Sequence, residues 1–122
     1  MQSPTSKLVV LMTHGIESEL SSVGFTIANG GLSAGLDVSM FMTSTAIDLV
    51  RRGGQRLTKV APLDSLDELI ADFLARGGVI WACPPCVQSR GYVQADLIDG
   101  VVIQGSSAVH ALIRDGAATL SF

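Results

Sequence analysis

The chain has 122 residues and a net charge of −3, with 48% apolar and only 16% charged residues. This length fits a single domain, residues 1–122, that buries most of its apolar side chains without the help of disulfides. The acidic balance argues against nucleic acid as a partner, because binding to the phosphate backbone requires a basic face.

The low share of charged residues predicts an oligomer. An average soluble domain has roughly 25% charged residues, so some apolar surface is expected to remain for a subunit interface. No apolar run approaches the roughly 18 to 20 residues that cross a bilayer, so no membrane is expected as a partner. The opening MQSPTSKLVVLMTHG has an apolar run of only five residues. Such a run is too short for a secretory signal, and we expect a cytoplasmic protein.

Short β-type runs alternate with longer segments of helical period. This alternation is typical of an α/β domain with a mostly parallel, five-stranded sheet and helices on both faces. Strands are predicted at residues 7–12, 36–42, 79–83, 100–105 and 117–122. Helices are predicted at residues 17–35, 44–54, 65–78, 84–91 and 106–116, with a helical turn or two at 93–99 and a surface connection at 54–64.

The first predicted helix is rich in glycine. Its helical period places four apolar residues on one face: Leu20, Val23, Ile27 and Ala34. Three glycines lie in or beside that face: Gly24, Gly30 and Gly31. Each glycine costs roughly 1 kcal/mol relative to alanine inside a helix. A close approach of this helix to the sheet or to another subunit would offset that cost, and Gly35 suits the left-handed position after its last turn.

The segment 65–78 is the most regular helical pattern in the chain. Ser65 and Glu68 have the spacing of a capping box, in which the serine hydroxyl accepts the backbone N–H three residues later. The helical period predicts one buried face, formed by Leu66, Leu69, Ile70, Phe73 and Leu74.

Both cysteines lie in the stretch VIWACPPCVQSRGY, residues 79–92. If the strand ends at Cys83, then Pro84 and Pro85 take the first two helical positions, where a missing N–H loses nothing. Cys83 is then the N-cap, and the backbone N–H of Cys86 can point at its sulfur. Because a helix N-terminus carries partial positive charge, we expect Cys83 to be the more acidic thiol.

Two further residues of this stretch belong to the predicted site. Arg90 follows Cys83 by about two helical turns. Its side chain could fold back and add a positive charge near the thiol, or it could bind the last carbonyls of the short helix before Gly91.

The Cys-x-x-Cys spacing is open to four interpretations. A zinc site would need two more ligands, and only His14 and His110 remain as histidines, so we expect no metal site. WACPPC is similar to a thioredoxin redox pair, although thioredoxins place theirs after an early strand. Free cysteines are also commonly buried as small hydrophobes. The fourth interpretation is a sulfur-carrying thiol at the carboxyl edge of the sheet, where α/β folds bind ligands.

Polar residues follow other predicted strands at the same edge. His14 comes after the first strand and could polarise a thiolate or donate a proton, although a loop histidine bonded to backbone is the simpler interpretation. Thr43 and Ser106 follow the second and fourth strands and could line the same cleft. Helix capping by itself accounts for Ser106, as it does for Ser44.

Two larger side chains are predicted to have structural roles. His110 lies in the last helix beside apolar neighbours, and we interpret it as a partly buried packing residue. Trp81 alternates with its neighbours in the third strand and is expected in the core.

The motif CPPCVQSRG, followed by a short turn, GVVIQG, a last helix and a closing strand, resembles the DsrE/DsrF-like family, in particular its YchN-like and TusD-like members. The stretches VVLMTHG and LSAGLDVSMF extend this resemblance over nearly the whole chain. It implies a doubly wound α/β subunit that assembles into trimers or hexamers and carries sulfur as a persulfide on a cysteine at the subunit interface. By its distance from Arg90 and Gly91, that cysteine corresponds to Cys83. Cys86 has no counterpart in the TusD-like members.

These observations lead to three hypotheses. In the first, a homo-oligomeric sulfur carrier takes sulfur from a donor protein on Cys83 and passes it to an acceptor protein, with Cys86 as a resolving or modulating thiol. This chemistry needs no metal or organic cofactor. In the second, the chain is a thiol–disulfide oxidoreductase in which Cys83 attacks and Cys86 resolves. In the third, it is a binding scaffold with inert cysteines.

Overall fold

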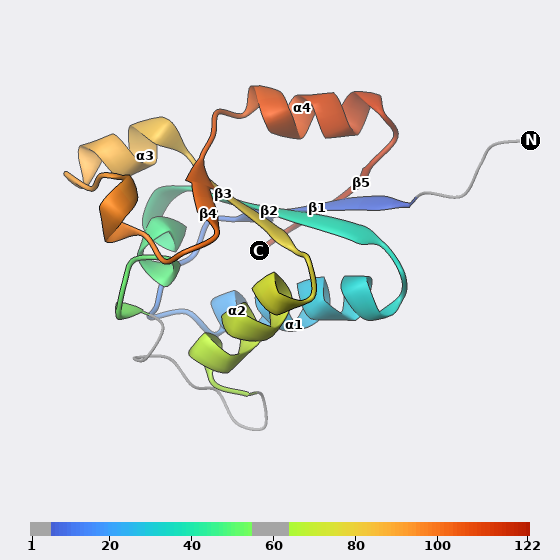
Figure 1. Ribbon diagram of the computed structural model, residues 1–122, viewed down its shortest axis with the longest axis horizontal. Helices are drawn as coiled ribbons and strands as arrows, with labels where there is room; N and C mark the ends of the chain where they lie inside the picture. Colours follow the sequence, from blue (N-terminus) through green and yellow to red (C-terminus); the bar gives the residue numbers. More distant parts are fainter. Residues whose placement is uncertain (1–5, 55–63) are drawn as a thin grey trace, which may run out of the picture.

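The computed structural model describes residues 6–54 and 64–122 and shows a five-stranded, wholly parallel sheet (Figure 1). In sheet order β4-β3-β2-β1-β5, the strands are β1 Lys7–Met12, β2 Asp37–Met42, β3 Val79–Ala82, β4 Val101–Ile103 and β5 Ala118–Ser121. The helices are α1 Glu19–Ser33, α2 Leu66–Ala75, α3 Pro84–Ser89 and α4 Ser107–Arg114, with the 3₁₀ helices η1 Ser44–Leu49 and η3 Gln94–Asp96.

The predicted fold class and strands are confirmed. The predicted helix at 44–54 is a shorter 3₁₀ helix, and residues 55–63 of the predicted surface connection lie outside the described residues.

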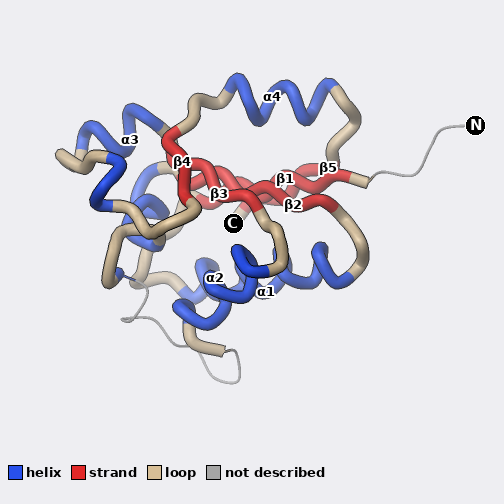
Figure 2. Tube along the Cα trace, in the orientation of Figure 1, coloured by secondary structure: helices blue, strands red, loops and turns tan. Residues whose placement is uncertain are grey.

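The helices form two unequal layers over the sheet. Figures 1 and 2 show α1 and α2 together on one face and α4 on the other, while α3 lies at the carboxyl end of the strands. All four α-helices end in the same way, because a glycine with positive φ follows each C-cap: Gly35, Gly77, Gly91 and Gly116. This left-handed position lets two backbone N–H groups turn back onto the last free carbonyls, and the prediction for Gly35 is confirmed.

The main core lies between the sheet and the layer of α1 and α2. Side chains at alternate strand positions point into it, as Leu8, Val10 and Met12 do from β1. Phe25 of α1 and Phe73 of α2 meet edge to face, with ring centroids 6.0 Å apart. The contact between these two rings joins α1 to α2 on the face of the sheet that both helices cover.

The expected close approach of α1 to the sheet is found at two of its three glycines. A Cβ added to Gly24 would lie 2.6 Å from Sδ of Met12, and one added to Gly31 would lie 3.0 Å from Cγ2 of Val38. A Cβ on Gly30 would meet nothing within 4 Å. The glycines at 24 and 31 therefore let the helix backbone rest directly on the strands.

The predicted apolar face of α1 is not its buried face. Leu20 and Ile27 are both 38% exposed, and the buried face carries small and polar residues beside Phe25: Ser21, Ser22, Gly24, Ala28, Asn29 and Gly31. The helix lies so close to the strands that only small side chains fit between them. Ser21 satisfies its hydroxyl by donating to the carbonyl oxygen of Gly15 at 2.6 Å.

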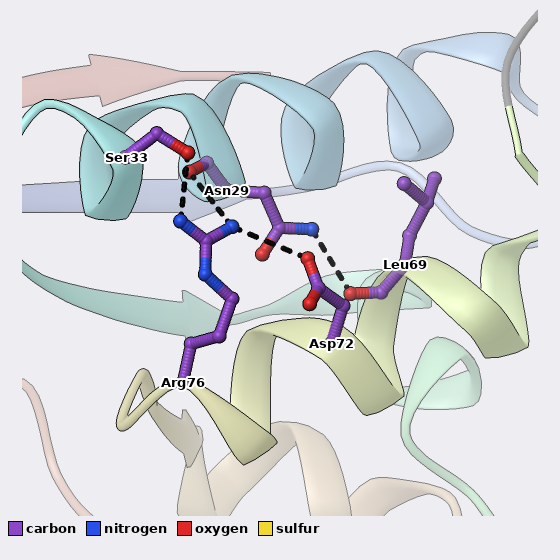
Figure 3. Close-up of polar contacts among 5 residues, drawn as sticks. All are labelled: Asn29, Ser33, Leu69, Asp72 and Arg76. Carbon is purple, nitrogen blue, oxygen red and sulfur yellow. Dashed lines mark hydrogen bonds and ion pairs between the residues drawn. The ribbon is translucent and has the colours of Figure 1, made fainter.

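A polar contact joins α1 to α2 beside the core (Figure 3). The buried Asn29 donates from Nδ2 to the carbonyl oxygen of Leu69 at 3.1 Å. Arg76, the C-cap of α2, donates to Oγ of Ser33 at 2.7 Å and forms an ion pair with Asp72 at 3.3 Å. The two helices are thus held in register by directional bonds as well as by apolar packing.

The predicted capping box at the start of α2 does not form. Ser65 is the N-cap, but its hydroxyl donates to Oδ1 of Asp67 at 2.6 Å instead of accepting from the helix. The same carboxylate oxygen accepts the N–H of Glu68 at 3.0 Å, since a charged oxygen is the stronger acceptor. The predicted apolar face is otherwise confirmed, with Leu74 only partly buried.

The α4 side of the sheet is much less covered. No residue of α4 is buried, and every residue of β5 is exposed. Val102 is 51% exposed and Ile113 is 44% exposed. Trp81, which we expected in the core, is partly exposed on this side, because the single helix α4 cannot cover the whole face.

Candidate functional site

Cys83 lies at the turn from β3 into α3, as the sequence predicts. It is the N-cap of α3 in an extended conformation, and two prolines occupy the first two helical positions. Its backbone N–H donates to the carbonyl oxygen of Met42, and its own carbonyl accepts the N–H of Val87, both at 3.0 Å. The turn is therefore fixed on the β2 side and on the α3 side, and the position of Cys83 is well defined.

The predicted acidity of the Cys83 thiol is wrong for this structure. The backbone N–H of Cys86 interacts with its sulfur, but not with the geometry of a full capping hydrogen bond. Burial raises the pKa of Cys83 above its ordinary value, and the adjacent Cys86 side chain raises that pKa too. The Cys86 backbone N–H lowers the pKa, but by less than burial raises it. Loss of water around the sulfur is the largest of these influences on the pKa of Cys83.

Cys86 faces the 3₁₀ helix η1. Its Sγ accepts the backbone N–H of Ser44 at 3.2 Å, and its side chain packs at the edge of the main core. Ser44 has φ +52°, so it reaches this position in a left-handed conformation and does not act as the cap predicted for it. The two thiols are neighbours with different surroundings.

Arg90 and Gly91 complete the end of α3. The Arg90 guanidinium donates to the carbonyl oxygen of Cys86 at 3.1 Å and is not among the groups that shift the pKa of Cys83. Gly91 has φ +71°, and its N–H and that of Tyr92 return to the carbonyls of Gln88 and Val87. In this structure both residues terminate the helix, which was the simpler of the two roles considered for Arg90.

A cleft of about 440 Å³ lies between α4 and the sheet, and Cys83 lines it. We call it the α4 cleft. Five other polar residues line it with Cys83: Thr43, Ser106, His110, Thr119 and Ser121. Apolar side chains line most of the remainder: Val9, Leu11, Phe41, Val109 and Ile113. Such a volume is within the range of small-molecule sites, which are mostly apolar with a few polar groups.

The positions of Thr43 and Cys83 in the α4 cleft follow from the strand register. Met42 pairs with Ala82, so Thr43 and Cys83 are the next residues along β2 and β3. Thr43 donates its hydroxyl to the carbonyl oxygen of Met12 at 2.9 Å. Ser106 is the N-cap of α4, but its side chain makes no capping bond, so the predicted capping role is not seen.

Of the two histidines, His110 lines the α4 cleft, and the simpler interpretation of His14 as a loop histidine fits its exposed position. His14 is exposed, with Nδ1 3.3 Å from the hydroxyl of Thr13, and it does not line the α4 cleft. His110 lines that cleft and is exposed, whereas it was predicted to be a partly buried packing residue. Its place one turn into the helix that follows the fourth strand, near the carboxyl edge of the sheet, is the signal that could have identified it.

Within residues 6–54 and 64–122, no three His, Cys, Asp or Glu side chains are grouped as a metal site would require. Among the helices described there, none has the length and apolar character needed to cross a bilayer.

The fold and the cleft define a small α/β domain with an all-parallel sheet and a cysteine at its carboxyl edge. Residues 6–122 match the DsrE/DsrF-like family, and the chain belongs to that family. Among curated proteins, it is 22% identical over 119 residues to the uncharacterized protein MJ0989 of Methanocaldococcus jannaschii, covering 95% of this chain and 99% of that protein.

Solved structures share the whole fold. YchN from E. coli is 21% identical with a TM-score of 0.79, covering 98% of this chain and 100% of that one. MTH1491 from Methanobacterium thermoautotrophicum, a protein of unknown function, is 16% identical with a TM-score of 0.73, covering 95% of this chain and 98% of that one. At these identities the likeness establishes a common YchN-like fold.

Proposed function

We propose that this protein carries sulfur as a persulfide on Cys83. The observation that supports this proposal most directly is the position of that thiol in a DsrE/DsrF-like chain, at a rigid strand-to-helix turn where it lines the α4 cleft. Sulfur transfer needs a cysteine that a second sulfur compound can reach, and the cleft supplies that access. The persulfide chemistry itself needs no metal or organic cofactor.

The transfer is one exchange of sulfur–sulfur bonds. The thiolate of Cys83 attacks the outer sulfur of a donor persulfide, a new S–S bond forms, and the S–S bond of the donor breaks. The donor leaves as a thiolate and takes up a proton. The outer sulfur now on Cys83 is passed to an acceptor thiolate by the same exchange. Because burial raises the pKa of Cys83, a base that takes the thiol proton would favour the attack.

Cys86 provides a second route by which a persulfide on Cys83 can be consumed. Its thiolate can attack the inner sulfur of a Cys83 persulfide, which releases hydrosulfide and leaves a disulfide between the two cysteines. The same pair could instead exchange disulfides with other thiols, as an oxidoreductase does. The nearness of the two side chains favours this second candidate function, since Cys86 directly affects the pKa of Cys83. Both reactions start from a reduced Cys83, and we propose the cytoplasm, where thiols are kept reduced.

Persulfide loading tests the proposal. The protein is incubated with a persulfide donor and its mass is measured, with peptide mapping to locate any added sulfur. We expect one extra sulfur atom on Cys83, its loss in Cys83→Ser, and longer-lived loading in Cys86→Ser. If Cys83 is never loaded but the pair cycles with glutathione, the oxidoreductase function replaces the sulfur carrier.

We also propose that the α4 side of the sheet binds other copies of this chain, as in the trimers or hexamers that the family resemblance implies. The exposed apolar residues of β4 and α4 support this, because large apolar patches usually mark an interface. Ile113→Lys should reduce the native mass measured by light scattering after gel filtration. Leu20→Lys, on the opposite face and 38% exposed, is the matched control. A monomeric wild-type protein would refute this assignment.

A further inference from the structure

Two ionisable side chains share the α4 cleft: Cys83 at the end of β3 and His110 one turn into α4. The other residues that line the cleft are apolar or carry a hydroxyl group, and none of them is Asp, Glu, Lys or Arg. Histidine is the side chain whose ordinary titration falls near neutral pH. Among the described residues lining this cleft, His110 is therefore the group suited to accept a proton from a thiol.

The hydrogen bond of His110 determines which ring nitrogen is basic. Nδ1 lies 2.8 Å from the carbonyl oxygen of Ser106. A carbonyl oxygen only accepts, so Nδ1 carries the hydrogen and the neutral ring keeps its lone pair on Nε2. The same carbonyl accepts the backbone N–H of His110 at 3.0 Å, so the ring is tied to the first turn of α4.

The charges around His110 are few. The elements packed beside it present uncharged residues to the cleft from β1, β2 and β5. On its own helix, Arg114 lies one turn further along and is exposed, and the following Asp115 forms an ion pair with Lys7 at 3.3 Å. No described carboxylate in the cleft competes with Cys83 for the imidazole.

We infer that His110 is the base that takes the proton from Cys83, directly or through one water molecule. This inference rests on the proposed function, in which the thiolate of Cys83 attacks a donor persulfide. The S–H bond of Cys83 breaks, its proton moves to Nε2 of His110, and the electron pair stays on sulfur. After the S–S bond of the donor breaks, the departing donor thiolate takes the proton back from the imidazolium. The atoms and charges balance over the cycle.

The two histidines of the chain make a matched pair for the test, since both follow strands and both are exposed. All variants carry Cys86→Ser so that Cys83 is the one thiol. The rate of alkylation by iodoacetamide is measured from pH 6 to pH 10 for the parent, His110→Gln and His14→Gln. Circular dichroism and the thermal midpoint check that each variant is folded.

General base catalysis typically contributes factors of roughly 10² to 10⁴, and for simple alkylation near pH 7 we expect the low end of that range, a loss of about 100-fold in His110→Gln. The pH profile of that variant should also become the simple rise of an isolated thiol, while His14→Gln keeps the parent profile. Equal rates and profiles for His110→Gln and the parent would overturn the inference, as would an equal loss in His14→Gln.

Alkylation needs no persulfide, so this experiment separates the inference from the proposed function. A His110-dependent profile in a protein that never accepts sulfur would support the base and refute the sulfur carrier. Sulfur loading on Cys83 that proceeds equally fast in His110→Gln would support the carrier and refute the base.

Discussion

Two adjacent glycines in α1 offer a direct test of how closely this helix packs on the sheet. We consider Gly31→Ala, with Gly30→Ala as its control. Both positions lie in the last part of the same helix. An alanine at Gly30 would project into open space, whereas at Gly31 it would lie 3.0 Å from Val38 and 3.1 Å from Leu8.

The expected magnitudes follow from two opposing effects. Replacing a helical glycine by alanine stabilises the helix by up to about 1 kcal/mol, and this gain applies to both variants. Overpacking a filled core costs typically about 1 to 3 kcal/mol and applies only at Gly31. The two strand residues there are 2% and 5% exposed, so they have little room to move. Gly30→Ala should therefore be stabilising, and Gly31→Ala should be less stable than it by about 1 to 3 kcal/mol.

Urea unfolding monitored by circular dichroism measures this difference as a change in midpoint at constant slope. In a thermal scan, each kcal/mol corresponds to about 4 °C for a domain of this size. Equal shifts in the two variants would show that α1 does not rest on the strands at Gly31. The close-packing explanation of the glycines would then be refuted.

Three other contacts give predictions for the free energy of unfolding. Asn29→Ala removes the buried hydrogen bond to Leu69 and should cost about 1 to 3 kcal/mol, whereas Arg76→Ala should cost less than about 1 kcal/mol because its ion pair is partly exposed. The reverse order in urea unfolding would contradict this reasoning. Tyr92 donates its hydroxyl to Asp48 at 2.7 Å, and that bond raises the pKa of Tyr92 above 10.0. An acid with a raised folded-state pKa contributes stability that is lost as pH rises, so the wild type should lose more stability above about pH 10 than Tyr92→Phe. Parallel pH curves for the two proteins would exclude that contribution.

Much of the fold could be predicted from local patterns. The alternation of strand-like and helical runs predicted a parallel α/β sheet. All five strands begin and end within two residues of their predicted bounds. The turn at Cys83 was also predictable, because two successive prolines suit the first turn of a helix and end the strand before it. Each of these features depends on a few neighbouring residues.

The exposed and buried faces could not all be predicted in this way. The apolar residues of α1 suggested a buried face at Leu20 and Ile27, yet the helix buries its small residues and Asn29 instead. Helical period shows which residues share a face but not how close the partner surface comes. Here the short distance to the strands selects residues by size rather than by hydrophobicity.

The candidate site shows the same division. The sequence by itself determined that Cys83 ends a strand and begins a helix, because the residues responsible are its immediate neighbours. Only the tertiary structure decided that its thiol is partly buried with a raised pKa, and that His110 rather than His14 shares its cleft. Loss of water and the meeting of side chains depend on segments far apart in the chain, above all on where α4 crosses the sheet, and no local pattern carries that information.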